Sequence, residues 1–303
     1  MQCVELTSAA GVVRMPVGGG PLPDQLSPDE KRRRHYELEK RLAERIRCAP
    51  ASDRARIAGE AMDTIFREIP WHPLLTLPGD EYHKRLARKI AEFSRWVPYG
   101  KDILDIGCGK GEMTAAFAAR SNSCTGIDVS AEILKDAPKD ANVTYLVMDA
   151  VKLDLPDSSF DVALSSQLIE HLHPQDVPNH FREVSRVLRP GGRYVFNTPN
   201  RISGPWDVSR YFDDVATGFH LKEWTYSELV AVLREAGFGR IASQALPSSL
   251  GWGSLFWLGR RGVWWKLLCE RICATIPRKG LRLKLSKVLN VNNIIIAAEK
   301  RGG

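Results

Sequence analysis

The sequence predicts an α/β fold built on a doubly wound parallel sheet, and two observations predict it. Short apolar runs near residues 102–106, 124–128, 143–147, 160–165 and 192–197 alternate with segments of helical pattern. The first run ends in Asp105 and is followed by glycines at 107, 109 and 111, and the second run ends in Asp128. A further strand is expected near 239–245, after a helix that begins with the capping box of Thr225 and Glu228.

The glycines and the two acids indicate a site for an adenosine-containing ligand. Glycines let the backbone turn sharply and approach the ligand, and an acid at the tip of the second strand accepts hydrogen bonds from ribose hydroxyls. Dinucleotide enzymes space these glycines as G-x-G-x-x-G, whereas here they stand at alternate positions. A pyrophosphate prefers a helix N-terminus free of acids, so Asp105 beside the loop favours a cationic ligand.

Five segments resemble, in order and spacing, the motifs of class I S-adenosylmethionine-dependent methyltransferases. They are Asp-Ile-Gly-Cys-Gly-Lys-Gly at 105–111, Gly-Ile-Asp-Val-Ser at 126–130, Met-Asp-Ala at 148–150, Ser-Phe-Asp-Val-Ala at 159–163 and Arg-Val-Leu-Arg-Pro-Gly-Gly at 186–192. The resemblance covers about residues 80–245 and the last apolar run, 293–298. It implies a Rossmann-like sheet of seven strands in which the last strand runs antiparallel.

The resemblance also implies that S-adenosylmethionine is the cofactor and which residues bind it. Asp105 and the 107–111 loop are expected along its amino-acid end, Asp128 at the ribose, and Asp149 at the adenine amino group. The alternative for these acids is a strand-end cap or turn. The complete expected cofactor set is Asp105, Gly107, Cys108, Gly109, Gly111, Asp128, Val129, Asp149, Ala150 and Gln167.

The catalytic candidates follow the fourth strand. Glu170 and His171 lie on the side of a doubly wound sheet where ligands bind. An imidazole with a pKa near 6.5 is suited to accepting a hydroxyl proton, so His171 is the candidate general base. The alternative is that its ring only orients the loop. His220 is the third candidate. Histidines 35, 72, 173 and 180 are expected on the surface or in packing, and His83 near the cofactor or substrate.

A divalent metal is the second interpretation of the same residues. Glu170, His171 and His220 match positions of a metal site in small-RNA 3′-terminal 2′-O-methyltransferases, and the first two also resemble ubiquinone-pathway O-methyltransferases. Gln167 stands where that pattern has its first Glu, and a neutral amide is a poorer ligand than a carboxylate. A hydrogen-bonded polar cluster is therefore the alternative to a metal.

Five segments make up the expected domain organisation. They are a disordered leader over 1–26, a helical extension over 27–99, the cofactor-binding core over 100–245, a basic amphipathic insertion over 246–290, and the last strand and tail over 291–303. Ser27 and Glu30 predict a capping box that begins the first helix of the extension. The extension either forms a lid over the cofactor or packs on the sheet edge.

The insertion holds the basic excess of the chain. Nine Lys and Arg residues and the single acid Glu270 lie between 258 and 290, a net charge of +8 within a chain of net +7. Its tryptophans are at 252, 257, 264 and 265, and the apolar positions 264, 267, 268, 272 and 276 have helical spacing, with Lys266, Glu270 and Arg271 expected opposite them. Such a segment suits an anionic membrane surface, RNA, or packing on the core.

Together these features predict an enzyme that methylates a hydroxyl of a small or lipid-linked acceptor, such as a glycan, a polyketide-like product or a quinone precursor. The alternatives are an RNA 2′-O-methyltransferase and a cofactor-binding scaffold without turnover. No run of eighteen uncharged apolar residues and no signal peptide is apparent. The six scattered cysteines suggest reduced thiols. We therefore expect a cytoplasmic protein with peripheral contact to an anionic membrane, and nucleic acid as the less favoured partner.

Overall fold

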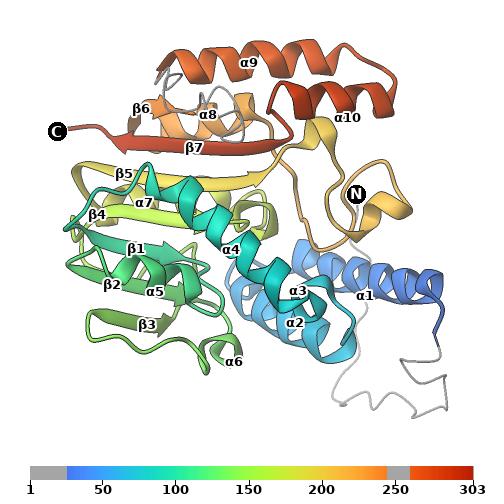
Figure 1. Ribbon diagram of the computed structural model, residues 1–303, viewed down its shortest axis with the longest axis horizontal. Coiled ribbons are helices and arrows are strands. Elements are labelled where there is room, and N and C mark those ends of the chain that lie inside the picture. The colour runs from blue at the N-terminus through green and yellow to red at the C-terminus, as the bar shows by residue number, and fades with distance from the viewer. Residues whose placement is uncertain (1–25, 244–259, 303) are drawn as a thin grey trace.

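A seven-stranded mixed sheet forms the centre of the molecule (Figure 1). The computed structural model describes residues 26–243 and 260–302. Its strands are β1 (Asp102–Ile106), β2 (Ser123–Asp128), β3 (Val143–Val147), β4 (Phe160–Ser166), β5 (Leu188–Pro199), β6 (Phe238–Ala242) and β7 (Asn293–Lys300). The order in the sheet is β3-β2-β1-β4-β5-β7-β6, and β7 runs antiparallel to both of its neighbours. The predicted strands and the antiparallel last strand are confirmed, and β5 begins four residues earlier than expected.

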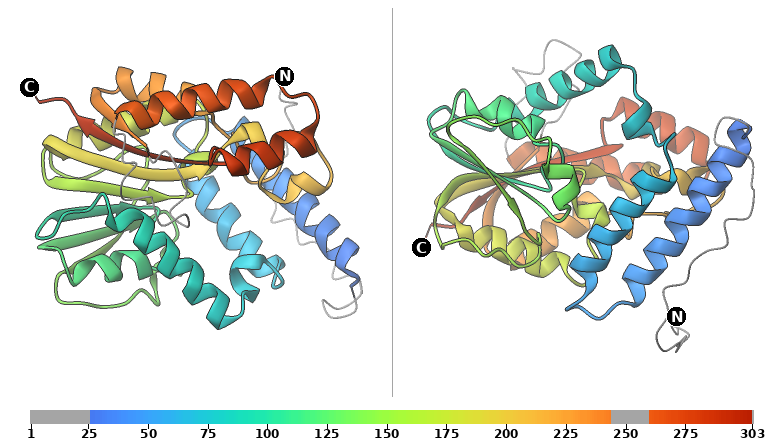
Figure 2. Two further views of the ribbon diagram at one scale, coloured as in Figure 1. Left: turned by 45° about the horizontal axis from the view of Figure 1, so that its top comes forward. Right: turned by 90° about the horizontal axis from the view of Figure 1, so that it is seen from below.

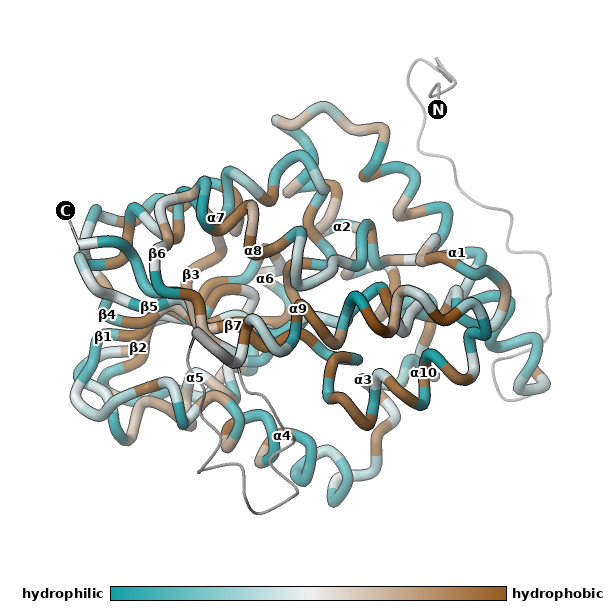
Figure 3. The backbone as a smooth tube through the Cα atoms, turned by 90° about the horizontal axis from the view of Figure 1, so that it is seen from above, coloured by the Kyte–Doolittle hydropathy of each residue, from teal (hydrophilic) through white to brown (hydrophobic). Residues whose placement is uncertain are grey.

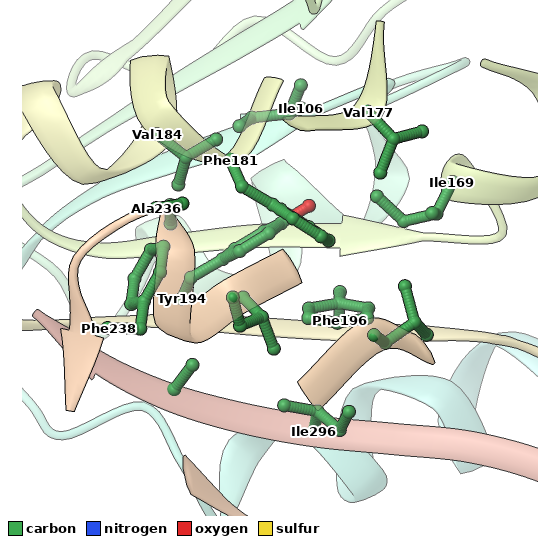
Figure 4. Close-up of a cluster of buried hydrophobic side chains, with 14 of the residues drawn as sticks. Ile106, Ile169, Val177, Phe181, Val184, Tyr194, Phe196, Ala236, Phe238 and Ile296 are labelled. Atoms are coloured by element: carbon green, nitrogen blue, oxygen red, sulfur yellow. The ribbon is translucent and has the colours of Figure 1, made fainter. Parts of the chain in front are cut away.

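Helices cover both faces of the sheet (Figure 2). They are α4 (Gly79–Ser94), α5 (Glu112–Ala118), α6 (Ala131–Leu134), α7 (Val177–Val187) and α8 (Tyr226–Glu235). The larger core cluster lies between the sheet and α7 and α8, where the rings of Phe181, Tyr194 and Phe196 pack against one another at tilted angles (Figure 4). A second cluster, which includes Phe93 and Phe117, fills the other face. Since β2 and β4 flank β1 on opposite sides, the carboxyl ends of β1 and β4 form the switch point where such folds bind ligands.

The N-terminal extension lies beside these carboxyl ends. It consists of α1 (Pro28–Cys48), α2 (Arg54–Glu68), the short α3 (Pro73–Thr76), which the sequence analysis missed, and α4. The capping box at Ser27 is present. Leu42 of α1 and Ile65 of α2 share an apolar cluster with Phe219, so α1 and α2 pack on the loop after β5 (Figure 2). Of the expected leader, only Leu26 falls within the described residues.

The basic insertion departs from the predicted orientation. It forms α9 (Arg260–Ala274) and α10 (Lys279–Val288), and residues 246–259 lie outside the described part of the chain. In α9 the expected polar face is buried, because Lys266 and Glu270 are 0% and 4% exposed. Trp264 and Leu268 are 70% and 51% exposed, as expected if this side of the helix meets a membrane rather than the core. The leucines at 281, 283 and 285, which alternate with polar residues in the sequence, lie in a helix.

Partners for the buried charges explain this inversion. Glu270 accepts hydrogen bonds from the backbone N–H groups of Tyr226 (2.7 Å) and Ser227 (3.1 Å) at the start of α8, and from the amide of Asn200 (3.0 Å). The ammonium of Lys266 donates to the carbonyl of Asn290. A buried charge is tolerated when it is hydrogen-bonded, so the sequence of α9 alone could not indicate which side faces the core.

Two further expectations concern cysteines and membranes. Cys108, Cys124, Cys269 and Cys273 are free thiols, but Cys48 is disulfide-bonded, so the expectation of reduced thiols is wrong at that position. Among the described residues, none of the helices combines the length and the apolar character that a membrane span requires.

Replacing Glu270 tests the inverted helix. Glu270→Ala removes the acceptor of three buried donors, so the free energy of unfolding should fall by about 3 kcal/mol. Urea denaturation measures it, and Arg271→Ala is the matched control, since Arg271 is the exposed neighbour on the same helix. Equal stability of the two variants would contradict the burial of Glu270.

Candidate active site

The glycine loop follows β1 as a series of left-handed backbone conformations. Gly107, Gly109 and Gly111 have φ angles of +68°, +56° and +73°, which side-chain-bearing residues rarely adopt. A Cβ atom at position 111 would also lie 2.5 Å from the ring of Tyr145. A Cβ atom at position 109 would meet no atom within 4 Å. The loop therefore leaves open space above Gly109, as a cradle for a ligand requires.

Asp105 is buried beneath this loop with half of its carboxylate unpaired. Its Oδ2 accepts a hydrogen bond from the hydroxyl of Thr114 at 2.7 Å, while Oδ1 has no hydrogen-bond partner. Burial raises the pKa of Asp105 to about 6, although Thr114 and the nearby ammonium of Lys89 oppose the shift. A buried, unpaired carboxylate oxygen fits a cationic ligand, such as the amino group of S-adenosylmethionine.

Asp128 connects the glycine loop to the turn after β2. Its Oδ2 accepts from the N–H of Gly109 at 2.9 Å, and its Oδ1 from the N–H of Ser130 at 3.0 Å. Burial raises the pKa of Asp128 despite these hydrogen bonds. Helix α2 covers the same turn: Asp63 accepts from the hydroxyl of Ser130 at 2.7 Å, and a Cβ atom at Gly59 would lie 3.4 Å from the carbonyl of Val129. The extension thus contacts the cofactor loops, as a lid would.

The adenine-side candidates lie after β3. Oδ1 of Asp149 accepts from the N–H of Val151 at 2.8 Å, and burial raises the pKa of Asp149. The carbonyl of Ala150 accepts from Nδ1 of His180 at 2.7 Å, and the other ring nitrogen bonds the hydroxyl of Tyr194 at 2.9 Å. His180 is therefore a buried support of this loop, in agreement with the packing role expected for it.

The fourth strand is followed by the catalytic candidates, which the structure brings together. Glu170 and His171 lie in a short 3-10 helix, η2 (Ile169–His171), and the rings of His171 and His220 meet edge to face with centroids 5.1 Å apart. Ligand atoms of Glu170, His171 and His220 lie within 4.8 Å of one another. Oε2 of Glu170 accepts from the hydroxyl of Thr198 at 2.8 Å, and its buried Oε1 has no hydrogen-bond partner.

The surroundings shift the pKa values of His171 and His220 in opposite directions. Burial lowers the pKa of His171, and Nδ1 of this ring donates to the carbonyl of Phe219 at 3.0 Å. Burial also opposes a charge on His220, but the hydrogen bond of Nδ1 to Glu223 (2.8 Å) and the carboxylates of Glu170 and Asp207 outweigh it and raise the pKa. A neutral ring thus lies beside one that favours the proton, a pattern typical of acid–base sites.

Gln167 and His83 were expected near the cofactor, and their side chains have other partners in the structure. Gln167 has a left-handed backbone, φ +56°, and its side-chain amide donates to Asn197 at 3.2 Å. Asn197 in turn donates to Glu92 of α4 at 3.2 Å. The amide of Gln167 is therefore bonded to β5, and its contact with the cofactor stays a prediction. His83 is exposed and meets the ring of Tyr82 edge to face, and the hydroxyl of Tyr82 bonds Glu112.

Sequence reasoning missed a second polar cluster beside the first. His35 and Glu39 of α1 are buried and joined at 2.7 Å, and the rings of His35 and His72 lie 5.0 Å apart. Burial lowers the pKa of His72 to about 4. Oε2 of Glu39 accepts from the N–H of Phe219 at 3.1 Å, the residue whose carbonyl holds His171. The signal was the spacing of His35 and Glu39, four apart on one helix face.

Comparisons with known proteins identify the sheet and its loops. Residues 104–196 match the family model described as "Methyltransferase domain". A protein of Mycolicibacterium smegmatis named "probable S-adenosylmethionine-dependent methyltransferase" is 34% identical over 157 residues, which cover 52% of this chain and 56% of that protein. A ubiquinone biosynthesis O-methyltransferase of Idiomarina loihiensis is 32% identical over 114 residues, 36% of this chain and 46% of that protein. The chain thus spans about half the length of these curated relatives.

Among solved structures, an S-adenosylmethionine-dependent methyltransferase of Mesorhizobium loti is similar with a TM-score of 0.46 and 22% identity, over 69% of this chain and 95% of that one. The family match covers the strands and loops that hold Asp105, Asp128, Asp149 and His171. Residues 104–196 thus form a methyltransferase domain that is similar to those of S-adenosylmethionine-dependent methyltransferases, which supports S-adenosylmethionine as the cofactor.

Proposed function

We propose that this protein transfers the methyl group of S-adenosylmethionine to a hydroxyl of a small or lipid-linked metabolite, with His171 as the general base. One observation carries the proposal: the carbonyl of Phe219 accepts the proton on Nδ1 of His171, so the neutral ring has its basic lone pair on Nε2. The ring also lies at the carboxyl end of β4, next to the switch point of the sheet.

The cofactor supplies a methyl group that is already activated on a sulfonium, so the protein must bind, align and deprotonate. The residues that would hold it are Asp105 and the glycine loop, Asp128, and the Asp149–Ala150 turn. The unpaired Oδ1 of Asp105 and the open space above Gly109 support this fit.

In the proposed reaction, Nε2 of His171 would take the proton of the acceptor hydroxyl while that oxygen forms its bond to the methyl carbon, the bond from this carbon to the sulfonium sulfur breaks, and S-adenosylhomocysteine is left as the product. Glu223 favours the protonated form of His220, which lies edge to face against His171, so His220 would hold the neighbouring ring and add positive charge near the developing alkoxide. Glu170 balances this charge from a fully buried position.

The hydroxyl acceptor itself has two supports. Among the relatives, the Idiomarina protein is named a ubiquinone biosynthesis O-methyltransferase, and its similarity includes the shared core. The base is a neutral imidazole, which suits the removal of a proton from a hydroxyl during transfer. An RNA 2′-O-methyltransferase and a scaffold without turnover are the alternatives that the acceptor experiment below separates.

A metal-assisted reaction is the second candidate, because the unpaired Oε1 of Glu170 lies in a group of three ligating residues. A metal bound there by Glu170, His171 and His220 would lower the pKa of the acceptor hydroxyl. Against it, Gln167 is turned to Asn197, so the fourth position of the pattern is not directed to the group. We therefore favour the hydrogen-bonded cluster.

The cofactor assignment predicts a pH-dependent affinity. Because Asp105 has a pKa of about 6, its carboxylate is charged at pH 7.5 and about nine-tenths protonated at pH 5. Calorimetry should therefore find that the Kd for S-adenosylhomocysteine rises about tenfold between pH 7.5 and 5. Asp105→Asn should bind weakly at both values, and Asp128→Ala should weaken binding at both while keeping the dependence. A wild-type Kd that is constant over this range would contradict the role of Asp105.

His171→Ala should lower turnover by about 10²–10⁴-fold with little change in cofactor affinity, since a positioned base acts mainly in the transition state. Release of S-adenosylhomocysteine is measured with a panel of catechols, polyprenylated phenols, hydroxylated glycolipids and RNA with a free 2′-hydroxyl end. His83→Ala, which changes an exposed histidine, is the control. Turnover with RNA alone would favour the RNA alternative, and rates of His171→Ala within a few-fold of wild type would make the histidine structural.

Chelation separates the two candidates for hydroxyl activation. We expect turnover to survive EDTA and to be unaffected by added Mg²⁺, Mn²⁺ or Zn²⁺, because the hydrogen-bonded cluster needs no ion. Metal content of the purified protein, measured by mass spectrometry, is the second readout. Activity lost in EDTA and restored by one of these ions would replace the general-base proposal with the metal-assisted one.

A further inference from the structure

The outward face of α9 is almost entirely apolar. Trp264, Leu268 and Ile272 are spaced four residues apart along it and are 70%, 51% and 45% exposed. Trp265, 39% exposed, widens this stripe. Figure 3 shows apolar and polar positions interspersed along α9 and α10. Large exposed apolar side chains in a contiguous stripe mark an interaction surface on a folded protein.

The orientation of this stripe is fixed by the opposite side of the helix. Glu270 is bonded to the start of α8, and Lys266 to the carbonyl of Asn290. Cys269 and Cys273 form a small apolar cluster with Val291 at the start of β7. Rotation of α9 to bury its tryptophans would expose these apolar groups and break the hydrogen bonds of both charges. These contacts therefore direct the stripe away from the sheet and the rest of the described core.

Basic side chains accompany the apolar stripe. Along residues 262–290, the one acidic side chain, Glu270, is buried, and the exposed charged side chains are Arg271, Arg278, Lys279, Lys284 and Lys287. Of these, Lys279 pairs with Asp214 at 3.0 Å. On α10 the exposed apolar Leu281 and Val288 lie among the lysines. Tryptophan and leucine beside Lys and Arg match the interface of an anionic bilayer, where apolar groups enter the acyl boundary and cations meet phosphates.

We propose that α9 and α10 dock on the surface of an anionic membrane. Single-stranded nucleic acid binds through aromatic stacking platforms. Half of the α9 stripe is aliphatic, which favours lipid over RNA. The exposed surfaces of Trp264 and Leu268 supply apolar insertion, and each basic residue near the lipid adds electrostatic attraction to the phosphates. Residues 244–259, which precede α9, lie outside the described part of the chain, so their coverage of the stripe is one outcome of the test below.

The docking helices are linked to the candidate active site. The amide of Asn200 donates to Glu270 of α9, and Asn200 is two residues after Thr198, whose hydroxyl donates to Glu170. Lys279 of α10 holds Asp214, in the loop that leads to His220. Docking would thus bring a membrane next to the loops around the site. The link between docking and catalysis rests on the proposed function, because it requires that the acceptor of the methyl group is a lipid-linked metabolite in the membrane.

Vesicle flotation at 50 mM NaCl tests the docking without any turnover. The full-length protein should float with vesicles of phosphatidylcholine and phosphatidylglycerol, should not float with phosphatidylcholine alone, and should release as salt is raised, because exposed charges are screened over roughly 8–10 Å near physiological ionic strength. The double variant Trp264→Ser with Leu268→Ser, and the charge reversal Lys284→Glu with Lys287→Glu, should each weaken binding about tenfold or more. Tyr99→Ser is the control, because Tyr99 is 75% exposed elsewhere on the surface.

Cofactor binding and urea stability of each variant show that it is folded and keep this test separate from the proposed function. Absence of flotation with anionic vesicles at low salt would overturn the proposal and indicate that the stripe is covered or binds something else. Flotation that both variants retain would also overturn it. Binding of a single-stranded RNA oligonucleotide in place of vesicles would assign the surface to nucleic acid. Failure of every acceptor with normal flotation would leave the docking intact and remove only the proposed reaction.

Discussion

The arrangement of the candidate site depends on the peptide group of Phe219. Its N–H is held by Glu39 of α1 and its carbonyl by Nδ1 of His171. One backbone unit therefore connects the N-terminal extension to the ring proposed as the base. Glu39 is buried, and its ionised form is favoured because the hydrogen bonds from His35 and Phe219 and the charge on His35 outweigh the cost of burial. Since an unpaired buried carboxylate is costly, the pairing with Phe219 restricts where this loop, and so His220, can lie.

This connection makes the extension part of the site. Helix α2 contacts Val129 and Ser130 beyond β2, α4 contacts Asn197 through Glu92, and α1 contacts the loop of Phe219. Each contact reaches a loop at the carboxyl end of a strand, which is where a doubly wound sheet binds its ligands. A helical segment that only covered the sheet edge would have contacted β3 or β6 instead. The extension therefore packs on the loops that hold the candidate cofactor and catalytic residues.

The features that could be predicted from the sequence are those that depend only on neighbouring residues in the chain. The strands, the glycine loop with its left-handed backbone and the capping boxes of Ser27 and Thr225 each depend on residues within a few positions of one another. The sequence could not predict the role of Glu39, whose partner Phe219 is 180 residues away. It also left Lys266 and Glu270 of α9 in solvent, because hydrophobic periodicity assigns charged residues to solvent unless a distant hydrogen-bond partner is known. For Glu270 those partners lie at Asn200, Tyr226 and Ser227.

The inversion of α9 has a consequence for how the fold carries an apolar surface. A helix whose apolar side packed on the core would present Lys266, Glu270 and Arg271 to water and would have no affinity for a bilayer. Here Glu270 is hydrogen-bonded to the start of α8, and Lys266 to the carbonyl of Asn290 before β7. These contacts turn the side of the helix that carries Trp264 away from the core. Glu270 also accepts a hydrogen bond from Asn200, which follows the end of β5. Thr198 at the same strand end donates to Glu170, so α9 is connected to the candidate site through this strand end. The buried polar side and the exposed apolar side of one helix therefore have linked functions: the first positions the helix relative to the site, and the second remains available for a membrane.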